Sequence, residues 1–267
     1  MKPITSMLIQ ELHAYAKNHQ IQKAVIGLSG GLDSAVALWI ATRAFGPKNV
    51  TALILPETKI TPAIDIEHAK ALAKHFGATM HYHAINSHLV DFNFMTWEET
   101  AESNQELKAQ IRAMLLRYYA KAHNALWISS VNKSDLSLGL GTIEGELAGD
   151  LHLLGDLYKS DIIEIAKHIG LPEELVSKEP SRNLKLGQTD LEDIGTAWPQ
   201  VDDVLRKLNS KVDPEVLIEK GMDSLVVHKI ARMVQSQNAR PKFTHIIPVG
   251  DIKAAIKKAQ AAEASSL

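Results

Sequence analysis

The stretch VIGLSGGLDSA, residues 25–35, decides the fold of this sequence of 267 residues. The apolar residues 24–28 lead into two adjacent glycines, Gly30 and Gly31, and an almost uniformly apolar segment follows, SAVALWIATRAF. A short run with β-branched residues is typical of a buried strand, and a segment that is apolar on nearly every side is typical of a helix packed against a sheet. The stretch therefore predicts a buried strand, a glycine-rich turn and a buried helix.

Outward from this unit, strand-like and helix-like segments alternate along the chain. Further strands are expected at NVTALILP (49–56), ATMHYHAI (78–85) and ALWISS (125–130). Helices are expected at 7–19, from the N-cap Thr61 and first-turn Pro62 to Gly77, at about 98–123 and at about 159–169. This alternation predicts an α/β fold, a doubly wound parallel sheet with flanking helices, whose ligands bind at the carboxyl ends of the strands.

The whole chain, residues 1–267, is expected to form a single domain with a small helical C-terminal portion at about 199–262. The polar stretch 179–195 is expected to be a loop that orders over a ligand, and the tail is expected to be a helix that frays at its end. The residues expected to fill the core as flexible apolar side chains are Met7, Met80, Met95 and Met114.

Composition excludes several classes of function. The net charge of −2, with Lys and Arg scattered along the chain, provides no basic surface for nucleic acid. No segment has the roughly 18 unbroken apolar residues of a membrane span, and the N-terminus lacks the apolar core of a signal peptide, so we expect a cytoplasmic protein without a membrane partner. The absence of cysteine excludes disulfides, thiolate metal sites and a cysteine nucleophile.

Ser29 has three interpretations. The G-x-S-x-G pattern of Gly27, Ser29 and Gly31 matches the nucleophile elbow of hydrolases, and with 12 histidines in the chain its partner is easily supplied by chance. A glycine-rich turn in which Asp33 caps the helix is the purely structural alternative. A phosphate-binding loop, the third interpretation, also explains the acid and the second hydroxyl at Asp33 and Ser34, for which an elbow has no use.

In the phosphate-loop interpretation every polar residue of the turn has a role. Gly30 and Gly31 let backbone N–H groups converge at the start of the helix, while Ser29 and Ser34 donate hydroxyl hydrogen bonds to phosphate oxygens. Because Asp33 alone would repel a polyphosphate, it implies a Mg²⁺ ion between carboxylate and phosphate. The Lys of the common G-x-x-x-x-G-K-[ST] loop is missing, which indicates a different class of nucleotide site.

The sequence S-G-G-L-D-S between strand and helix resembles the pyrophosphate loop of the N-type ATP pyrophosphatases, which implies an adenine nucleotide alpha-hydrolase-like fold. From about residue 21 to residue 248 the chain resembles one branch of them, the ammonia-dependent NAD synthetases. The absence of cysteine agrees with a synthetase that uses free ammonia instead of a glutaminase domain. The segments that carry this resemblance are VNKSDLSLGLGT (131–142), GDLYKSDIIEIAKHIGLP (155–172), KEPSRNLKLGQTDLEDIG (178–195) and, more loosely, HKIARMVQSQNARPKFTHIIP (228–248).

The resemblance implies a reaction and a set of roles. The carboxylate of deamido-NAD (nicotinic acid adenine dinucleotide) attacks the α-phosphorus of MgATP, and ammonia then displaces AMP from the acyl-adenylate. It also implies a homodimer formed through the long helix at about 98–123. The residues to which it assigns roles are Ser29, Gly30, Gly31, Asp33, Ser34, Leu55 and Arg112 for ATP, Asp33 and Asp135 for Mg²⁺, and Lys159, Ser181 and Glu146 for the chemistry.

The acyl-substrate pocket implied by the resemblance is where this sequence departs from the family. Glu106 and Gln110 replace an Asn and an Arg, Leu140 and Glu144 replace aromatic residues, and Glu146 replaces an Asp. A positive charge is lost and a negative charge is gained near an anionic dinucleotide. Two alternatives therefore stay open: an adenylating amide ligase for another carboxylate, and a nucleotide-binding protein without turnover. The predicted acyl set is Glu106, Gln110, Leu140, Thr142, Glu144 and Asp150.

Overall fold

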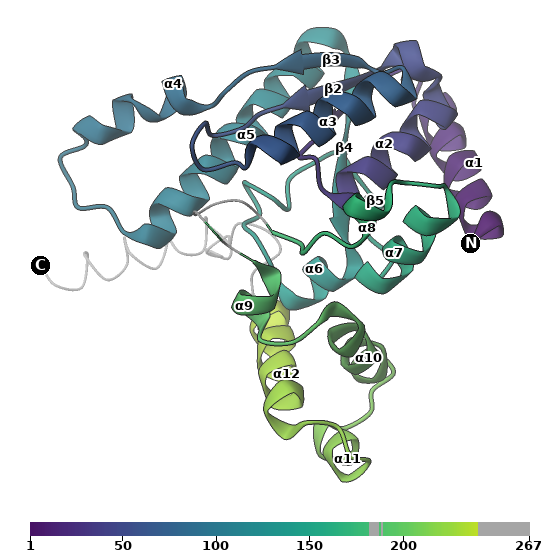
Figure 1. Ribbon diagram of the computed structural model, residues 1–267, viewed down its shortest axis with the longest axis vertical. Helices are drawn as coiled ribbons and strands as arrows, with labels where there is room; N and C mark the ends of the chain where they lie inside the picture. The colour runs from purple at the N-terminus through teal and green to yellow at the C-terminus, as the bar shows by residue number, and fades with distance from the viewer. Residues whose placement is uncertain (182–186, 188, 240–267) are drawn as a thin grey trace, which may run out of the picture. The chain divides into compact units, whose positions relative to one another are not determined.

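The computed structural model describes residues 1–181, 187 and 189–239 (Figure 1). Residues Met1–Gln237 form one compact unit, and Asn238–Leu267 form a second, most of which lies outside the described residues. The tail expected to be a fraying helix falls in that second unit beyond residue 239. The architecture below is therefore that of the first unit.

A five-stranded parallel sheet forms the centre of this unit (Figure 1). Its strand order is β3-β2-β1-β4-β5, so the order reverses beside β1, where Ala24 pairs with Val50 of β2 on one side and with Leu126 of β4 on the other. The predicted doubly wound parallel sheet is confirmed. The strands are β1 (Lys23–Gly27), β2 (Val50–Ile54), β3 (Thr79–Tyr82), β4 (Ala125–Asn132) and β5 (Leu151–Leu154).

Alternate residues of the strands build two separate apolar cores. Ala24 and Ile26 of β1 belong to the core on one face of the sheet, which includes side chains of α1, α2, α3 and α7. Val25 belongs to the core on the other face, where α5 packs. The helices of these two faces are α1 (Lys2–Asn18), α2 (Leu32–Phe45), α3 (Ala63–Phe76), α5 (Ala101–His123) and α7 (Lys159–His168).

A third apolar core belongs to the helices near the C-terminal end of the first unit. Trp198, Val201 and Leu205 of α10 are buried there together with Leu138 of α6 and Tyr158, the residue before α7. This core joins the C-terminal helices to the helices that follow β4 and β5. The remaining elements are η1 (Pro47–Asn49), α4 (Asn86–Leu89), η2 (Asp91–Phe94), α6 (Lys133–Leu138), α8 (Glu173–Val176), α9 (Asp190–Ile194), α10 (Trp198–Asn209), α11 (Pro214–Glu219) and α12 (Ser224–Ala239).

Several local expectations need correction. The long helix begins at Ala101 rather than at about 98, because the hydroxyl of Thr100 accepts a hydrogen bond from the backbone of Ser103 and caps it. Strand β5 has no counterpart among the predicted strands. The polar stretch 179–195 contains the short helix α9 among its described residues. Three of the four methionines expected in the core are exposed, namely Met7 (53%), Met80 (41%) and Met114 (53%).

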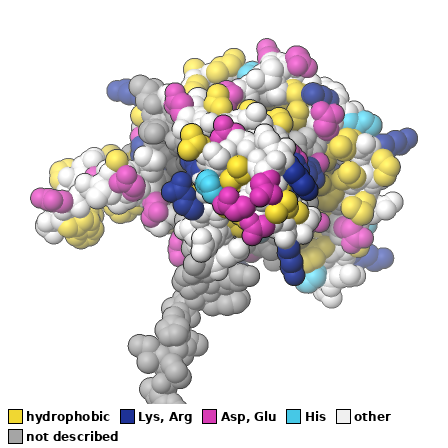
Figure 2. Space-filling view, turned by 90° about the horizontal axis from the view of Figure 1, so that it is seen from below, with side chains coloured by type: hydrophobic (Ala, Val, Ile, Leu, Met, Phe, Trp, Pro, Cys, Tyr) yellow, Lys and Arg dark blue, Asp and Glu magenta, His cyan; other side chains and the backbone are white. Residues whose placement is uncertain are grey.

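The described surface mixes charges of both signs. On the face seen in Figure 2, Lys and Arg side chains of the described residues lie among Asp and Glu and form no continuous basic band. None of the described helices combines the length and the apolar character that crossing a membrane would require.

Candidate active site

The loop between β1 and α2 is held in shape by its own hydroxyl groups. The hydroxyl of Ser29 accepts a hydrogen bond from the backbone N–H of Gly31 (3.1 Å) and lies 3.1 Å from the hydroxyl of Ser34, which donates to the carbonyl of Gly31 (2.9 Å). Gly30 has φ = 79°, and a Cβ there would collide with the backbone carbonyl of Asp65. The turn is therefore preformed, and only glycine fits at its tightest point.

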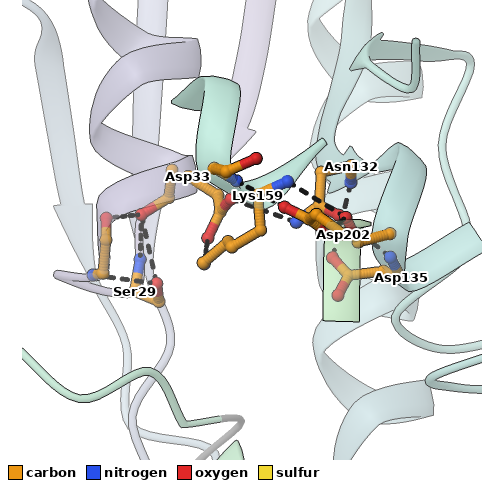
Figure 3. Close-up of polar contacts among 10 residues, drawn as sticks. Ser29, Asp33, Asn132, Asp135, Lys159 and Asp202 are labelled. Atoms are coloured by element: carbon orange, nitrogen blue, oxygen red, sulfur yellow. Dashed lines mark hydrogen bonds and ion pairs between the residues drawn. The ribbon is translucent and has the colours of Figure 1, made fainter. Parts of the chain in front are cut away.

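Asp33 lies in the first turn of α2 and is contacted from two other elements (Figure 3). Its Oδ1 accepts a hydrogen bond from Nδ2 of Asn132 (3.2 Å), and its Oδ2 forms an ion pair with Nζ of Lys159. The Lys159 side chain is 6% exposed and the Asp33 side chain is 21% exposed, so this ion pair is largely shielded from water. The fold thus brings together two residues that are 126 positions apart in the sequence.

Asp135 lies at the start of α6, beside this ion pair. Its backbone N–H donates to Oδ1 of Asn132 (2.9 Å), and its carboxylate accepts from the backbone N–H of Asn132 (3.4 Å) in a reciprocal capping box. Burial, together with the negative charge of Asp33, raises the pKa of Asp135 to about 7. Burial alone would lower the pKa of Lys159, but the charges of Asp33 and Asp135 outweigh it and raise that pKa. Two carboxylates thus share one buried cation.

Two adjoining cavities open around the loop, and we name them by their walls. The apolar cavity has Leu53, Leu55 and Trp127 in its wall, and the polar cavity has Asp33, Asp135 and Lys159. Both lie beside the carboxyl ends of β1 and β4, where the strand order reverses, which is the usual ligand position in such sheets. The residues that line both cavities are Ser29, Ser130, Val131, Glu146 and Ser181.

The residues predicted to contact ATP and to perform the chemistry line one or both of these cavities, except Gly30, which is buried and lines neither. Ser29, Gly31 and Ser34 line the polar cavity, while Leu55 and Arg112 line the apolar cavity. Nε of Arg112 donates to the carbonyl of Leu55 (3.0 Å). Burial lowers the pKa of Arg112, although the negative charges of Glu57 and Glu146 act in the opposite direction. The guanidinium therefore fixes the backbone that forms one wall of the apolar cavity.

The predicted acyl set does not come together in the same way. Only Leu140 of this set lines one of the two cavities. Glu106, Gln110 and Glu144 are exposed, outside both cavity walls. Asp150 is also outside both cavity walls, and it forms an ion pair with Arg117.

Thr142, the remaining residue of the predicted acyl set, lies next to Glu146. Its backbone N–H donates to Oε2 of Glu146 (3.2 Å), which orients that carboxylate toward the junction of the two cavities. Its hydroxyl is buried and has no hydrogen-bond partner among the described residues. Thr142 therefore contacts a residue that lines both cavities but lines neither itself.

The hydrolase interpretation of Ser29 lacks the base that it requires. No histidine is among the described residues that line either cavity, and the Ser29 hydroxyl is engaged with Gly31 and Ser34. A serine nucleophile needs a base within hydrogen-bond reach. The geometry favours the phosphate-loop interpretation.

Sequence reasoning missed several residues of the site. Asn132, which links Asp33 to Asp135, is the last residue of the eight-residue strand β4, and its position at a carboxyl strand end was a usable signal. Asp190 and Trp198 line the polar cavity from the segment after residue 181. Nothing in the local pattern marked these two, because they reach the cavity only through tertiary packing.

Comparisons with known proteins agree with this geometry. A sequence model of the family described as NAD synthase matches residues 4–243. The NH3-dependent NAD synthetase of Methanosarcina mazei is 34% identical over 228 residues, which cover 83% of this chain and 88% of the relative.

Two solved structures extend the likeness to the fold. An NMN synthetase from Francisella tularensis has a TM-score of 0.79 and 26% identity, and covers 93% of this chain and 98% of its own. An NH3-dependent NAD synthetase from Campylobacter jejuni, in complex with the nitrate ion, has a TM-score of 0.77 and 29% identity, and covers 92% of this chain and 99% of its own.

Proposed function

The chain belongs to the NAD synthase family, and from this premise we propose that the protein is an ammonia-dependent NAD synthetase. It converts deamido-NAD and ammonia to NAD at the expense of ATP, with AMP and pyrophosphate as the other products. The observation that carries the proposal is the cluster of Asp33, Asp135 and Lys159 in the polar cavity, next to the preformed loop.

In the first step the substrate carboxylate attacks the α-phosphorus of ATP, and the bond to the pyrophosphate leaving group breaks. The loop residues Ser29, Gly30, Gly31 and Ser34 bind the β- and γ-phosphates through hydroxyl and backbone N–H groups. Lys159 stabilises the negative charge that develops on the α-phosphate, an interaction worth several kcal/mol in a site that excludes water. The adenine lies in the apolar cavity against the backbone at Leu55, which Arg112 holds.

In the second step ammonia attacks the acyl carbon, and the bond to AMP breaks. Glu146 accepts a proton from ammonium, so that the free amine is available as the nucleophile. Ser181 positions the adenylate. The placement of Glu146 and Ser181 in the walls of both cavities supports these roles, because the bond that is made and broken lies between the nucleoside and the phosphate ends.

We also propose that Asp33 and Asp135 hold Mg²⁺. The residues present fit that ion: oxygen ligands suit it, and burial, together with the negative charge of Asp33, raises the pKa of Asp135 to about 7, an effect that a cation between the two carboxylates would offset. Bound there, the ion would neutralise phosphate charge. Without it, Lys159 is the counter-ion of Asp33.

The reaction is tested with the purified chain, MgATP, ammonium and deamido-NAD. We expect NAD, AMP and pyrophosphate in equal amounts, and no NAD when any one reactant is omitted. ATP turnover that appears only with other acids would support an amide ligase for a different substrate. Tight ATP binding without pyrophosphate release would support a nucleotide-binding protein without turnover.

A second substrate is favoured by specific observations. The related structure from Francisella tularensis is named an NMN synthetase, and the chain lacks a positive charge at Gln110 and carries an added negative charge at Glu144. A mononucleotide, deamido-NMN, has a similar charge near pH 7 but lacks the adenosine half of deamido-NAD, so it loses less from the absence of an aromatic side chain at position 144. The test is the ratio of kcat/KM for the two acyl substrates under the same conditions, and a ratio above one for deamido-NMN would favour the NMN synthetase.

We further propose that the protein is a cytoplasmic homodimer associated through α5. The helix exposes Met114 (53%) and Tyr118 (74%), which a partner copy would cover. Light scattering on the purified chain is expected to give twice the monomer mass, and Tyr118→Glu is expected to give the monomer.

A further inference from the structure

Asp202 of α10 is a buried carboxylate to which neither the sequence pattern nor the proposed reaction assigns a role. It is 1% exposed, and both of its oxygens are used. Oδ1 accepts a hydrogen bond from the hydroxyl of Ser134 (2.5 Å), and Oδ2 accepts one from the backbone N–H of Ser160 (2.7 Å). Figure 3 shows it beside the cluster of Asp33, Lys159 and Asp135.

These hydrogen bonds complete the first turn of α7, the helix that carries Lys159. The side chain of Tyr158, at the N-cap of α7, makes no capping hydrogen bond. The hydroxyl of Ser134 accepts instead from the backbone N–H of Lys159 (3.0 Å), and Asp202 accepts from the next N–H. A negative carboxylate at the start of a ten-residue helix is also favoured by the helix dipole.

The same carboxylate also fixes the helix that carries the second acid. Ser134 directly precedes Asp135 in α6, and the Ser134 side chain is fully buried between Asp202 and the backbone of Lys159. Arg206 of α10 contacts α7 at a second point through Asp161 (2.7 Å), but that pair is partly exposed. Asp202 thus connects the two helices that supply Lys159 and Asp135.

We propose that Asp202 is a positioning residue of the synthetase reaction, which holds Lys159 and Asp135 at their places opposite Asp33. It acts through Ser134 and touches no substrate. This inference rests on the proposed function, and it makes the C-terminal helical core a working part of the active site. Residues that orient the groups in contact with a metal or substrate commonly contribute about 10- to 100-fold.

The test is Asp202→Asn, compared with Asp203→Asn on the same helix. Asn keeps the size and one acceptor oxygen at position 202, whereas Asp203 pairs with Lys207 at the surface (2.8 Å). We expect Asp202→Asn to lower kcat about 10- to 100-fold and to change the KM for ATP less than about threefold. We expect Asp203→Asn to leave both within about twofold of the parent protein.

A second readout needs no turnover. Mg²⁺ strengthens ATP binding through Asp33 and Asp135, and calorimetry gives the ratio of the Kd for ATP without and with Mg²⁺. We expect this ratio to fall in Asp202→Asn and to stay unchanged in Asp203→Asn. If the parent protein makes neither NAD nor NMN, the proposed function fails, but a ratio that falls only in Asp202→Asn still supports the positioning role.

A loss of protein stability is distinguished from a loss of positioning by measuring kcat at several temperatures and by a second variant. A purely structural role predicts that kcat recovers to the parent value well below the unfolding midpoint, whereas a positioning role predicts a loss that persists there. Ser134→Ala removes the same link with a smaller change and decides the matter if Asp202→Asn does not fold. An unchanged kcat and an unchanged Mg²⁺ ratio in the folded variant overturn the proposal.

Discussion

The residues of the polar cavity are far apart in the sequence but close together in the fold, whereas the exposed residues of the predicted acyl set are closer in the sequence and share neither cavity. Asp33, Asp135 and Lys159 come from three separate segments and meet in one cavity, because the ends of parallel strands gather at one edge of the sheet. Glu106, Gln110 and Glu144 are closer in sequence, yet they are exposed and outside both cavities. The residues proposed to bind Mg²⁺ and phosphate are held by the core of the fold, whereas the exposed residues of the predicted acyl set lie on a surface helix and loop, where a substitution disturbs no core packing.

The largest expected effect is at Asp33. Asp33→Asn removes the charge that pairs with Lys159 and that would hold Mg²⁺, so adenylation is expected to fall roughly a thousandfold or more, about 4 kcal/mol in barrier. Pyrophosphate release measures the rate, and thermal unfolding checks that the fold is intact. The control is Asp156→Asn, whose carboxylate is 95% exposed and should change the rate little. Retained activity in Asp33→Asn would remove the metal role.

Lys159 is expected to give the next largest effect. Lys159→Met is expected to lower kcat about 10²- to 10³-fold with a smaller change in the KM for ATP, because the charge acts mainly on the transition state. The matched control is Lys167→Met on the same helix, where the lysine pairs with Glu164 at the surface. Equal losses in the two variants would assign Lys159 to helix stability instead.

The acyl set is tested by restoring family-like residues. The double variant Gln110→Arg and Glu144→Tyr restores a positive charge and an aromatic side chain, which can stack on the adenosine half that deamido-NMN lacks, so the kcat/KM for deamido-NAD relative to deamido-NMN is expected to rise about tenfold. The kinetic constants for ATP should stay within about twofold, since neither residue lines the cavities. A change in the ATP constants alone would contradict the separation of the two regions.

The smallest expected effect is at Ser29. Ser29→Ala removes one hydroxyl from the loop but leaves the backbone N–H groups and Ser34, so ATP affinity is expected to fall about fivefold, as for the loss of one hydrogen bond. Calorimetry with MgATP measures the change. Complete loss of activity, together with labelling of Ser29 by a serine-directed covalent inhibitor, would restore the hydrolase interpretation.

The local patterns predicted most of the sheet and the faces of its helices. β5 escaped prediction because Leu151–Leu154 is short and only its last two residues are buried, so it lacks the long apolar run of a central strand. The exposed Met114 was misassigned because apolar spacing on α5 does not tell which apolar residues face the sheet and which face away from it. The resemblance located Asp135 and Lys159. It did not reveal Asn132, which bonds to Asp33 and Asp135, or Asp202, which connects the helices of Asp135 and Lys159.

The sequence by itself determined the alternation of the first four strands with helices, the glycine-rich turn and the acid after it, because periodicity and backbone freedom act between near neighbours. Only the tertiary structure decided that Lys159 faces Asp33 and that Asp202 caps the helix of Lys159. Those contacts depend on strand order and on how α10 packs against α7, which are set by burial over the whole molecule. A local pattern records that a residue is buried, but it does not record which distant residue lies opposite.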